Sequence, residues 1–423
     1  MKSIIENTFI ERLTKQFQRS PLQRNNLQTS DAEIIQCPDN PNVSLAVTID
    51  SIAEEISAGL YVDPYLAGWI AVMANMSDLA AVGAQPLGIL VSEVLPEKFS
   101  EESLARLQRG LHDACKACGT FILGGDTNFG ERLMLTGCAL GTVNAGALLS
   151  RKGSHPGDVL YASGCLGSGN AFALEYFMRT HPSGPGPARA PESIDYLNTV
   201  SDAGDFLHYH PVARLKEGQS ICGVASSCMD TSDGVLATLD QLMRVNHAGF
   251  ELEKNWELAI VPHARRIVRE FNMPDWFLLA GQHGEFELLF TLPQERERNL
   301  MIAAERIDWK PIRLGKVIEE CEIRFPFAGK MVAPDTSRIR NLNFEAGEDI
   351  QAYIRELFAM NDQLEASEIL SHRHGEPSSA CLQAGGTRGT SQCSKNETVH
   401  EGVIERGEHV QGDTLIGCTS VST

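Results

Sequence analysis

The sequence predicts an α/β fold built from two units, because strand-like and helical segments alternate twice along the chain. Residues 42–50 alternate apolar and polar side chains as a half-buried strand does. Residues 64–84 form a long apolar helical segment, and residues 86–95 are again strand-like. A second succession of strand, glycine turn and helix begins at Asp158. This order is typical of layered α/β proteins.

The first unit contains the clearest periodic patterns. In residues 42–50, the apolar side chains that share one face are Val43, Leu45, Val47 and Ile49. The next helix is expected to end near Cys118, and its apolar face consists of Leu104, Leu107, Leu111, Cys115 and Cys118. Because Cys115 and Cys118 complete this face, we interpret both thiols as core residues rather than as a redox or zinc site.

The stretch 118–137 has two interpretations. Residues 121–123 are expected to form a short buried strand, and residues 133–135 begin another. Between them, Gly124-Gly125-Asp126-Thr127 has the composition of a hairpin turn. Alternatively, Asp126 is a carboxylate held at a strand end to bind a metal ion or a phosphate. Taken alone, the stretch leaves both interpretations open.

The second unit has its own succession of elements. They are a strand at 158–164, a helix at 170–180, a strand ending at Asp230, a helix from Gly234 to about Val245 and a strand at 285–292. Residues 181–191 are a loop rich in proline and glycine. We therefore expect an N-terminal α/β domain at 1–150, a second α/β domain at 151–360 and a disordered polar tail at 361–423.

The composition excludes some classes of function. With 43% hydrophobic and 22% charged residues, the chain has an ordinary globular composition. A net charge of −19 argues against a nucleic-acid-binding protein, which normally carries a basic surface. The first twenty residues lack the apolar core of a signal peptide, and no apolar run approaches the length of a membrane span. We expect a cytoplasmic protein that binds neither nucleic acid nor membranes.

Aspartates recur where predicted strands end and helices begin. Asp50 ends the strand at 42–50, where a turn or a helix cap would also explain it. Asp78 lies inside the apolar helical segment, where a carboxylate is costly unless it is paired or metal-bound. Asp230 and Asp233 are three residues apart at a helix start, where Ser232 or Asp233 could simply cap the helix. Two carboxylates in that position repel each other unless a cation lies between them.

These carboxylates point to magnesium and a phosphate compound. Oxygen ligands without clustered histidines or thiolates suit Mg²⁺, which commonly bridges the phosphates of a nucleotide. The chain has no Walker A sequence, and the glycines at 164–169 do not fit the dinucleotide-binding pattern G-x-G-x-x-G. The residues therefore predict a magnesium- and ATP-using enzyme outside the P-loop and Rossmann classes.

Seven motifs, in order over roughly residues 30–295, resemble those of thiamine-monophosphate kinases. The wider superfamily includes aminoimidazole-ribonucleotide synthetase and selenophosphate synthetase. The motifs are "VTIDS", "ANMSDLAAVGAQP", "GGDTN", "LLSRKGSHPGDVLYASGCLG", "HPVARLKEG", "MDTSDG" and "EFELLFTLP". The resemblance implies an N-terminal domain whose strands pair with those of a second protomer to form a barrel. It also implies that ATP and Mg²⁺ ions lie in a cleft near that homodimer interface.

The resemblance also implies roles for individual residues. The magnesium ligands would be Asp31, Thr48, Asp50, Asp78, Asp126, Asp230 and Asp233. Of these, Asp50, Asp126 and Asp233 would be catalytic. The nucleotide would meet Arg151, Ser232, Gly125, Thr127 and the position of Cys118. Such a site works by positioning and charge neutralisation in an in-line transfer, without a phospho-enzyme.

The chain departs from the family mainly on the acceptor side. Ser30 replaces an early aspartate, Ser57 a substrate-contacting histidine, Cys118 a nucleotide-contacting aromatic residue and Gly284 a substrate-side glutamate. Glu285 stands where the family has aspartate, and the neighbouring His283 is either a replacement acceptor-binding group or a turn residue.

We therefore predict an ATP- and Mg²⁺-dependent phosphotransferase that acts on a small phosphate substrate. Its reaction would resemble the conversion of thiamine phosphate and ATP to thiamine diphosphate and ADP, with the acceptor open. One alternative is a synthetase-like enzyme that activates a carbonyl oxygen and releases ADP and phosphate. Another is a non-catalytic homologue that binds nucleotide.

Overall fold

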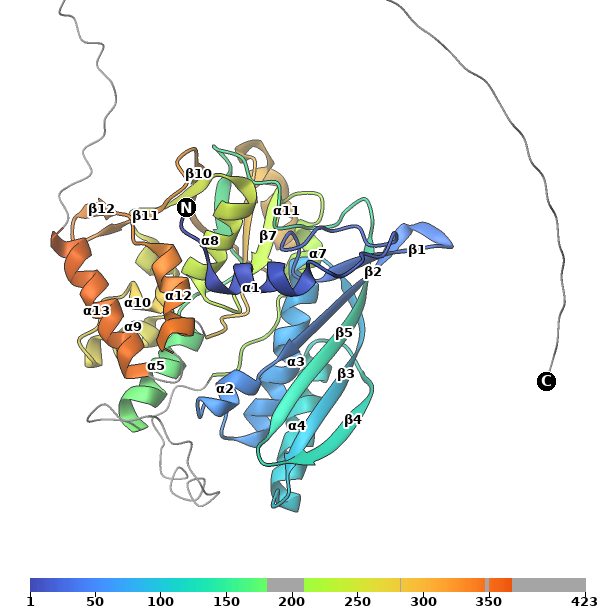
Figure 1. Cartoon of the computed structure of the whole chain (residues 1–423). Helices are drawn as coiled ribbons and strands as arrows, with labels where there is room; N and C mark the ends of the chain where they lie inside the picture. The colour runs from blue at the N-terminus through green and yellow to red at the C-terminus, as the bar shows by residue number, and fades with distance from the viewer. Residues whose placement is uncertain (181–208, 282, 347–349, 367–423) are drawn as a thin grey trace, which may run out of the picture. The chain divides into compact units, whose positions relative to one another are not determined.

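A computed structural model describes residues 1–180, 209–281, 283–346 and 350–366 of the chain. The loop expected at 181–191, Gln282 and residues 367–423 lie outside the described residues. The predicted α/β class is confirmed, because strands form two separate sheets with helices packed against them (Figure 1). Strands before residue 145 make one sheet, and strands after residue 158 make the other.

The first sheet has the strand order β1-β2-β5-β3-β4. Its strands are β1 (Glu33–Cys37), β2 (Asn40–Ser51), β3 (Gln85–Pro96), β4 (Ile122–Gly130) and β5 (Met134–Asn144). Helix α3 (Pro64–Ala81) packs against β2, β3 and β5, and α4 (Glu101–Ala117) packs on α3. Gly110 permits this close packing, because a Cβ there would lie 2.0 Å from the Tyr65 carbonyl oxygen. Helix α3 is consequently buried on nearly every side, as its apolar sequence predicts.

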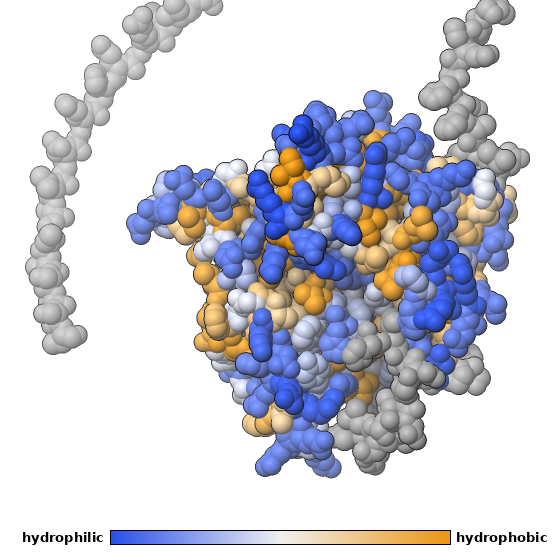
Figure 2. Space-filling model, turned by 180° about the vertical axis from the view of Figure 1, so that it is seen from behind, coloured by the Kyte–Doolittle hydropathy of each residue, from blue (hydrophilic) through white to orange (hydrophobic). Residues whose placement is uncertain are grey.

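The opposite face of this sheet is apolar and exposed in the part of the chain that the structure describes. In β2 the buried side chains facing α3 are Ser44, Ala46 and Thr48, so the predicted apolar face lies on the outer side. Ile49 on that side is 68% exposed, and Leu90 of β3 is also exposed. Figure 2, which views the molecule from behind, shows hydrophobic residues at the surface on the side where this sheet lies, left in that view. A contiguous apolar face of this kind usually marks an interface.

The prediction for residues 118–137 was wrong in two respects. Residues 121–123 are exposed instead of buried, and Gly124–Thr127 are not a turn, because they lie within β4. Strand β4 pairs in parallel with β3, whereas β5 pairs with β3 and β2, so β4 and β5 do not form a hairpin. Gly125 is required by this pairing, since a Cβ there would lie 1.9 Å from the Val91 carbonyl oxygen.

The second sheet has the order β12-β11-β8-β10-β6-β9-β7. Its strands are β6 (Val159–Ala162), β7 (Ser227–Asp230), β8 (Gly249–Leu252), β9 (Leu288–Leu292), β10 (Ile312–Ile318), β11 (Ile323–Phe327) and β12 (Lys330–Val332). The helices of this part are α5 (Ser168–Thr180), α7 (Leu215–Ile221), α8 (Val235–Asn246), α9 (Pro262–Glu270), α10 (Phe277–Ala280), α11 (Glu297–Glu305), α12 (Thr336–Ala346) and α13 (Ile350–Ala366). The last helix corrects the predicted tail: residues 361–366 belong to α13, where Leu364 packs in the core.

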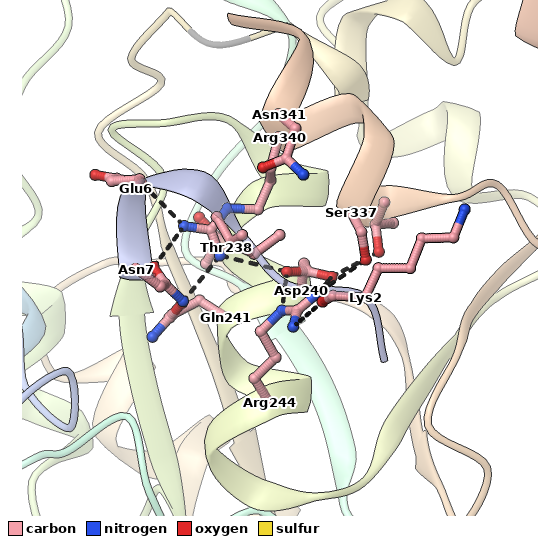
Figure 3. A network of polar contacts seen from close by, with 12 residues as sticks. Lys2, Glu6, Asn7, Thr238, Asp240, Gln241, Arg244, Ser337, Arg340 and Asn341 are labelled. Atoms are coloured by element: carbon pink, nitrogen blue, oxygen red, sulfur yellow. Dashed lines mark hydrogen bonds and ion pairs between the residues drawn. The ribbon is translucent and has the colours of Figure 1, made fainter. Parts of the chain in front are cut away.

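The N-terminal helix α1 (Ile5–Thr14) contacts α12. A polar network joins it to α8 and α12 (Figure 3). Arg340 donates to Glu6 at 3.2 Å and to Asp240 at 3.3 Å, and Arg244 pairs with Asp240 at 2.6 Å. The remaining short helix of the first part is α2 (Ala53–Ser57). Among the described helices, none combines the length and apolar character needed to cross a membrane.

Candidate active site

Three aspartates from distant parts of the chain meet in the interior. Asp31 precedes β1, Asp78 lies in α3 and Asp230 ends β7. One carboxylate oxygen from each lies within 4.8 Å of the other two. Contacts of α3 with both the first sheet and β7 bring the three together. The site is thus shared between the two parts that carry the two sheets.

Hydroxyl groups orient these carboxylates. Ser77 donates to Asp230 Oδ2 at 2.6 Å, and Ser232 donates to Asp230 Oδ1 at 3.2 Å. Thr48 donates a short hydrogen bond to Asp78 Oδ2. Thr48 and Asp78, which were both predicted as magnesium ligands, are therefore neighbours.

The carboxylates disfavour each other's ionisation. Burial raises the pKa of Asp78 well above its usual range, and the charges of Asp50, Asp230 and Asp31 raise it further. Burial and the Asp31 charge raise the pKa of Asp230 to about 8. The pKa values of Asp31 and Asp50 are also raised, mainly by burial. A cation between these groups would relieve the repulsion.

The site suits a divalent cation such as Mg²⁺. Its grouped donors are carboxylate oxygens, which hard cations prefer. Asp31 Oδ2 is buried and has no hydrogen-bond partner among the described residues, so it is available as a ligand. Asp50 lies close by, since its backbone N–H donates to Asn75 Oδ1 at 3.1 Å and its charge acts on Asp78.

Arg151 supplies the cationic side of the site. It donates to Asp31 Oδ1 through Nη2 at 2.9 Å and through Nε at 3.2 Å. The loop after it is fixed by Asn246, whose Oδ1 accepts from Gly153 N at 2.7 Å and from Ser154 N at 3.1 Å. The same side chain donates to the Arg151 carbonyl at 2.8 Å. The guanidinium is therefore held beside the carboxylates by the C-terminal end of α8.

Asp233 is exposed at the start of α8. The helix begins after Gly234 without a side-chain cap, so the capping interpretation of Ser232 or Asp233 is wrong. The charge of Asp233 adds to the effect of burial in raising the pKa of Asp50, but Asp233 is not one of the three grouped carboxylates.

Asp126 is not part of the grouped carboxylates. It is exposed on β4, where it accepts from Asn128 at 2.6 Å, and Thr127 donates to Glu93 at 2.9 Å. Cys118 ends α4 with its sulfur 3.7 Å from that of Met73, and burial raises the pKa of its thiol to about 12. This packing agrees with the interpretation of Cys118 as a core residue.

The three predicted acceptor-side residues have different surroundings. Ser57 ends α2 and is half-buried. The ring of His283 lies 5.9 Å from that of Phe177, and burial lowers the pKa of His283 to about 4, so it is neutral at pH 7. Glu285 accepts from Ser168 N at 2.9 Å at the start of α5. It is therefore engaged in holding a helix end.

Sequence reasoning did not identify Asn75, Ser77 and Asn246 as positioning residues. Asn75 and Ser77 are buried next to Asp78 in an otherwise apolar helix, and that placement was the available signal. Asn246 gave no signal, because its partners in the Arg151 loop lie more than ninety positions away in the sequence.

Comparison with known proteins agrees with this geometry. Residues 29–143, which contain Asp31, Asp50, Asp78 and Asp126, match the family described as AIR synthase related protein, N-terminal domain. A thiamine-monophosphate kinase of Haemophilus influenzae is 26% identical over 345 residues, which cover 80% of this chain and 96% of that protein. The corresponding protein of Pyrococcus abyssi is 29% identical over 327 residues, or 76% of this chain and 94% of that protein. The chain is similar to thiamine-monophosphate kinases over most of its length.

The fold of this chain also occurs in a solved structure, that of AaThiL complexed with AMPPCP and TMP. The two share 22% identity with a TM-score of 0.58, over 77% of this chain and 93% of the other. At that level of identity, the likeness shows a common fold.

Proposed function

We propose that this protein is an ATP- and Mg²⁺-dependent kinase that phosphorylates the phosphate group of thiamine monophosphate. The observation that carries the proposal is the meeting of Asp31, Asp78 and Asp230 within 4.8 Å, beside Arg151, in a homologue of enzymes with that name. The neighbour solved with AMPPCP and TMP supports the same pair of substrates.

Several residues of this chain would hold the magnesium ions. They are Asp31, Asp78 and Asp230, with Asp50, Asp233 and Thr48 at the margin of the group. When bound, Mg²⁺ supplies charge neutralisation for the transferring phosphoryl group. Arg151 would orient a phosphate oxygen, and Ser77, Ser232 and Asn75 would fix the positions of the carboxylates and of the Asp50 backbone. Catalysis by such a site rests on positioning.

The roles of Asp126, Gly125, Thr127 and Cys118 remain predictions from the resemblance. So do the acceptor-side roles of Ser57, His283 and Glu285. The helix-capping hydrogen bonds of Glu285 argue for a structural role of that side chain. A cytoplasmic location, where ATP is available, is likewise our proposal.

We also propose that a second copy of the chain covers the outer face of the first sheet. That face exposes Ile49, Leu90 and Met134, and its edge strand β4 exposes Phe129. Strands from two copies would then build the barrel that the resemblance implies. A homodimer is supported by this surface, since burying exposed apolar area is favourable.

One assay tests the enzymatic proposal. The protein is incubated with Mg-ATP and thiamine monophosphate, and the products are identified by mass. Thiamine diphosphate with ADP is expected. Free phosphate together with a condensed product from another acceptor would instead identify a synthetase-like enzyme. Tight nucleotide binding without turnover on any acceptor would contradict both enzymatic functions.

A further inference from the structure

Buried polar atoms without partners are concentrated in one loop. Six such side-chain atoms occur in the described part of the chain, and three belong to residues 28–31: Gln28 Nε2, Ser30 Oγ and Asp31 Oδ2. A buried polar atom without a hydrogen bond costs free energy. Such atoms are therefore rare unless a ligand or a water molecule forms the missing hydrogen bond. Their concentration beside the grouped carboxylates points to a bound group.

The loop is held so that these atoms stay buried. The Thr29 carbonyl accepts from Arg151 N at 3.0 Å and from Ser150 Oγ at 2.8 Å. Asp31 Oδ1 is fixed by the Arg151 guanidinium. Gln28 adopts φ of 62°, a left-handed conformation that residues other than glycine rarely adopt. Such strain persists where the surroundings enforce it, often at ligand sites.

The chemistry of the three atoms is complementary to a phosphate beside a cation. The Gln28 amide nitrogen donates only, the Ser30 hydroxyl donates or accepts, and phosphate oxygens accept. Asp31 Oδ2 repels an anion but binds a cation. Ser30 and Gln28 carry no charge, so they add no repulsion toward a phosphate, whereas an aspartate at position 30 would.

We infer that Gln28 and Ser30 bind a phosphate oxygen of the nucleotide directly, next to the cation that Asp31 shares with Asp78 and Asp230. The inference rests on the proposed function and adds two residues to its nucleotide site. It also gives Ser30 a role: beside Gln28, it would bind the nucleotide phosphate as a neutral donor, where an aspartate would require a further metal ion.

The test is calorimetric titration of the full chain with AMPPCP at saturating Mg²⁺. Gln28→Ala and Ser30→Ala should each weaken binding by about tenfold or more, the usual effect of losing a buried hydrogen bond to a charged group. Gln36→Ala, a matched change on the neighbouring strand β1, should bind AMPPCP as the wild type does. Melting curves without ligand establish that each variant is folded. Ser30→Asp should raise the Mg²⁺ concentration needed for half-maximal AMPPCP binding.

The outcomes separate this inference from the proposed function. If the wild type binds AMPPCP and both alanine variants bind it equally well, then water and not the nucleotide is the hydrogen-bond partner of these atoms. The inference is then overturned. Failure of the wild type to bind AMPPCP would overturn the inference and the proposed function together. If the two alanine variants bind more weakly while the wild type does not phosphorylate thiamine monophosphate, the inference stands and the proposed acceptor falls.

Discussion

Asp78 illustrates the conflict between stability and function at a single residue. It is only 8% exposed, yet Asp50, Asp230 and Asp31 surround it with negative charge. In the absence of a cation, these carboxylates share protons or repel one another. The arrangement is unfavourable for the free protein and favourable once a divalent cation binds, which is typical of functional sites.

Asp78→Asn should therefore separate activity from stability. Replacing one carboxylate by an amide lowers the repulsion, so the free energy of unfolding in the presence of EDTA should increase. Phosphoryl transfer should fall on the order of 100-fold or more, because a ligand is lost. Melting curves in EDTA and steady-state kinetics measure the two effects. Full activity in the variant would remove Asp78 from the site.

Glu285 makes stability depend on pH. Burial raises its pKa from 4.5 to about 8. Between these pH values the folded chain binds more protons than the unfolded chain, so this group's contribution to stability is lost as the pH rises through the window. Glu285→Gln removes the titration, and the variant should gain stability relative to the wild type between pH 5 and pH 9. Urea unfolding at both pH values tests this. Glu295→Gln, an exposed control, should change nothing.

At the scale of elements, α8 connects several parts of the site. It begins just after Asp230 and Asp233, and its last residue, Asn246, holds the loop of Arg151. In its middle, Asp240 binds Arg244 and Arg340 and so attaches α12 and α1 (Figure 3). A shift of α8 would therefore move both the aspartates before the helix and the loop that carries Arg151.

Asp240→Asn should destabilise the fold strongly. Asp240 is fully buried, and the variant leaves the Arg244 and Arg340 guanidinium groups without its charge. Breaking a buried pair in this way costs about 3–5 kcal/mol. Lys2→Ala removes an exposed pair with Asp335 in the same region and should cost less than about 1 kcal/mol. Denaturant unfolding distinguishes the two, and equal small losses would show that the network contributes little.

At the scale of the whole molecule, the uncovered face of the first sheet is the main surface to explain. Leu90→Arg places a charge in that face and should convert a dimer into monomers in sedimentation or light-scattering measurements. Leu258→Arg changes a leucine that is 72% exposed in the second part of the chain, and it should leave the dimer intact. A wild type that remains monomeric at high concentration would contradict the proposed dimer.

Local patterns in the sequence were enough to predict the α/β class and the approximate extents of α3 and β2, and they singled out Asp78 and Asp230, whereas Asp31 was named only through the family resemblance. The predictions from local patterns follow from periodicity and from the cost of placing carboxylates in apolar segments. The pairing of β4 with β3 and the outward orientation of the apolar side of β2 depended on contacts between distant segments. So did the loop geometry that leaves Gln28 and Ser30 without partners, because hydrogen bonds from Ser150 and Arg151 impose it. No local pattern encodes which distant groups meet, so these features became apparent only in the folded chain.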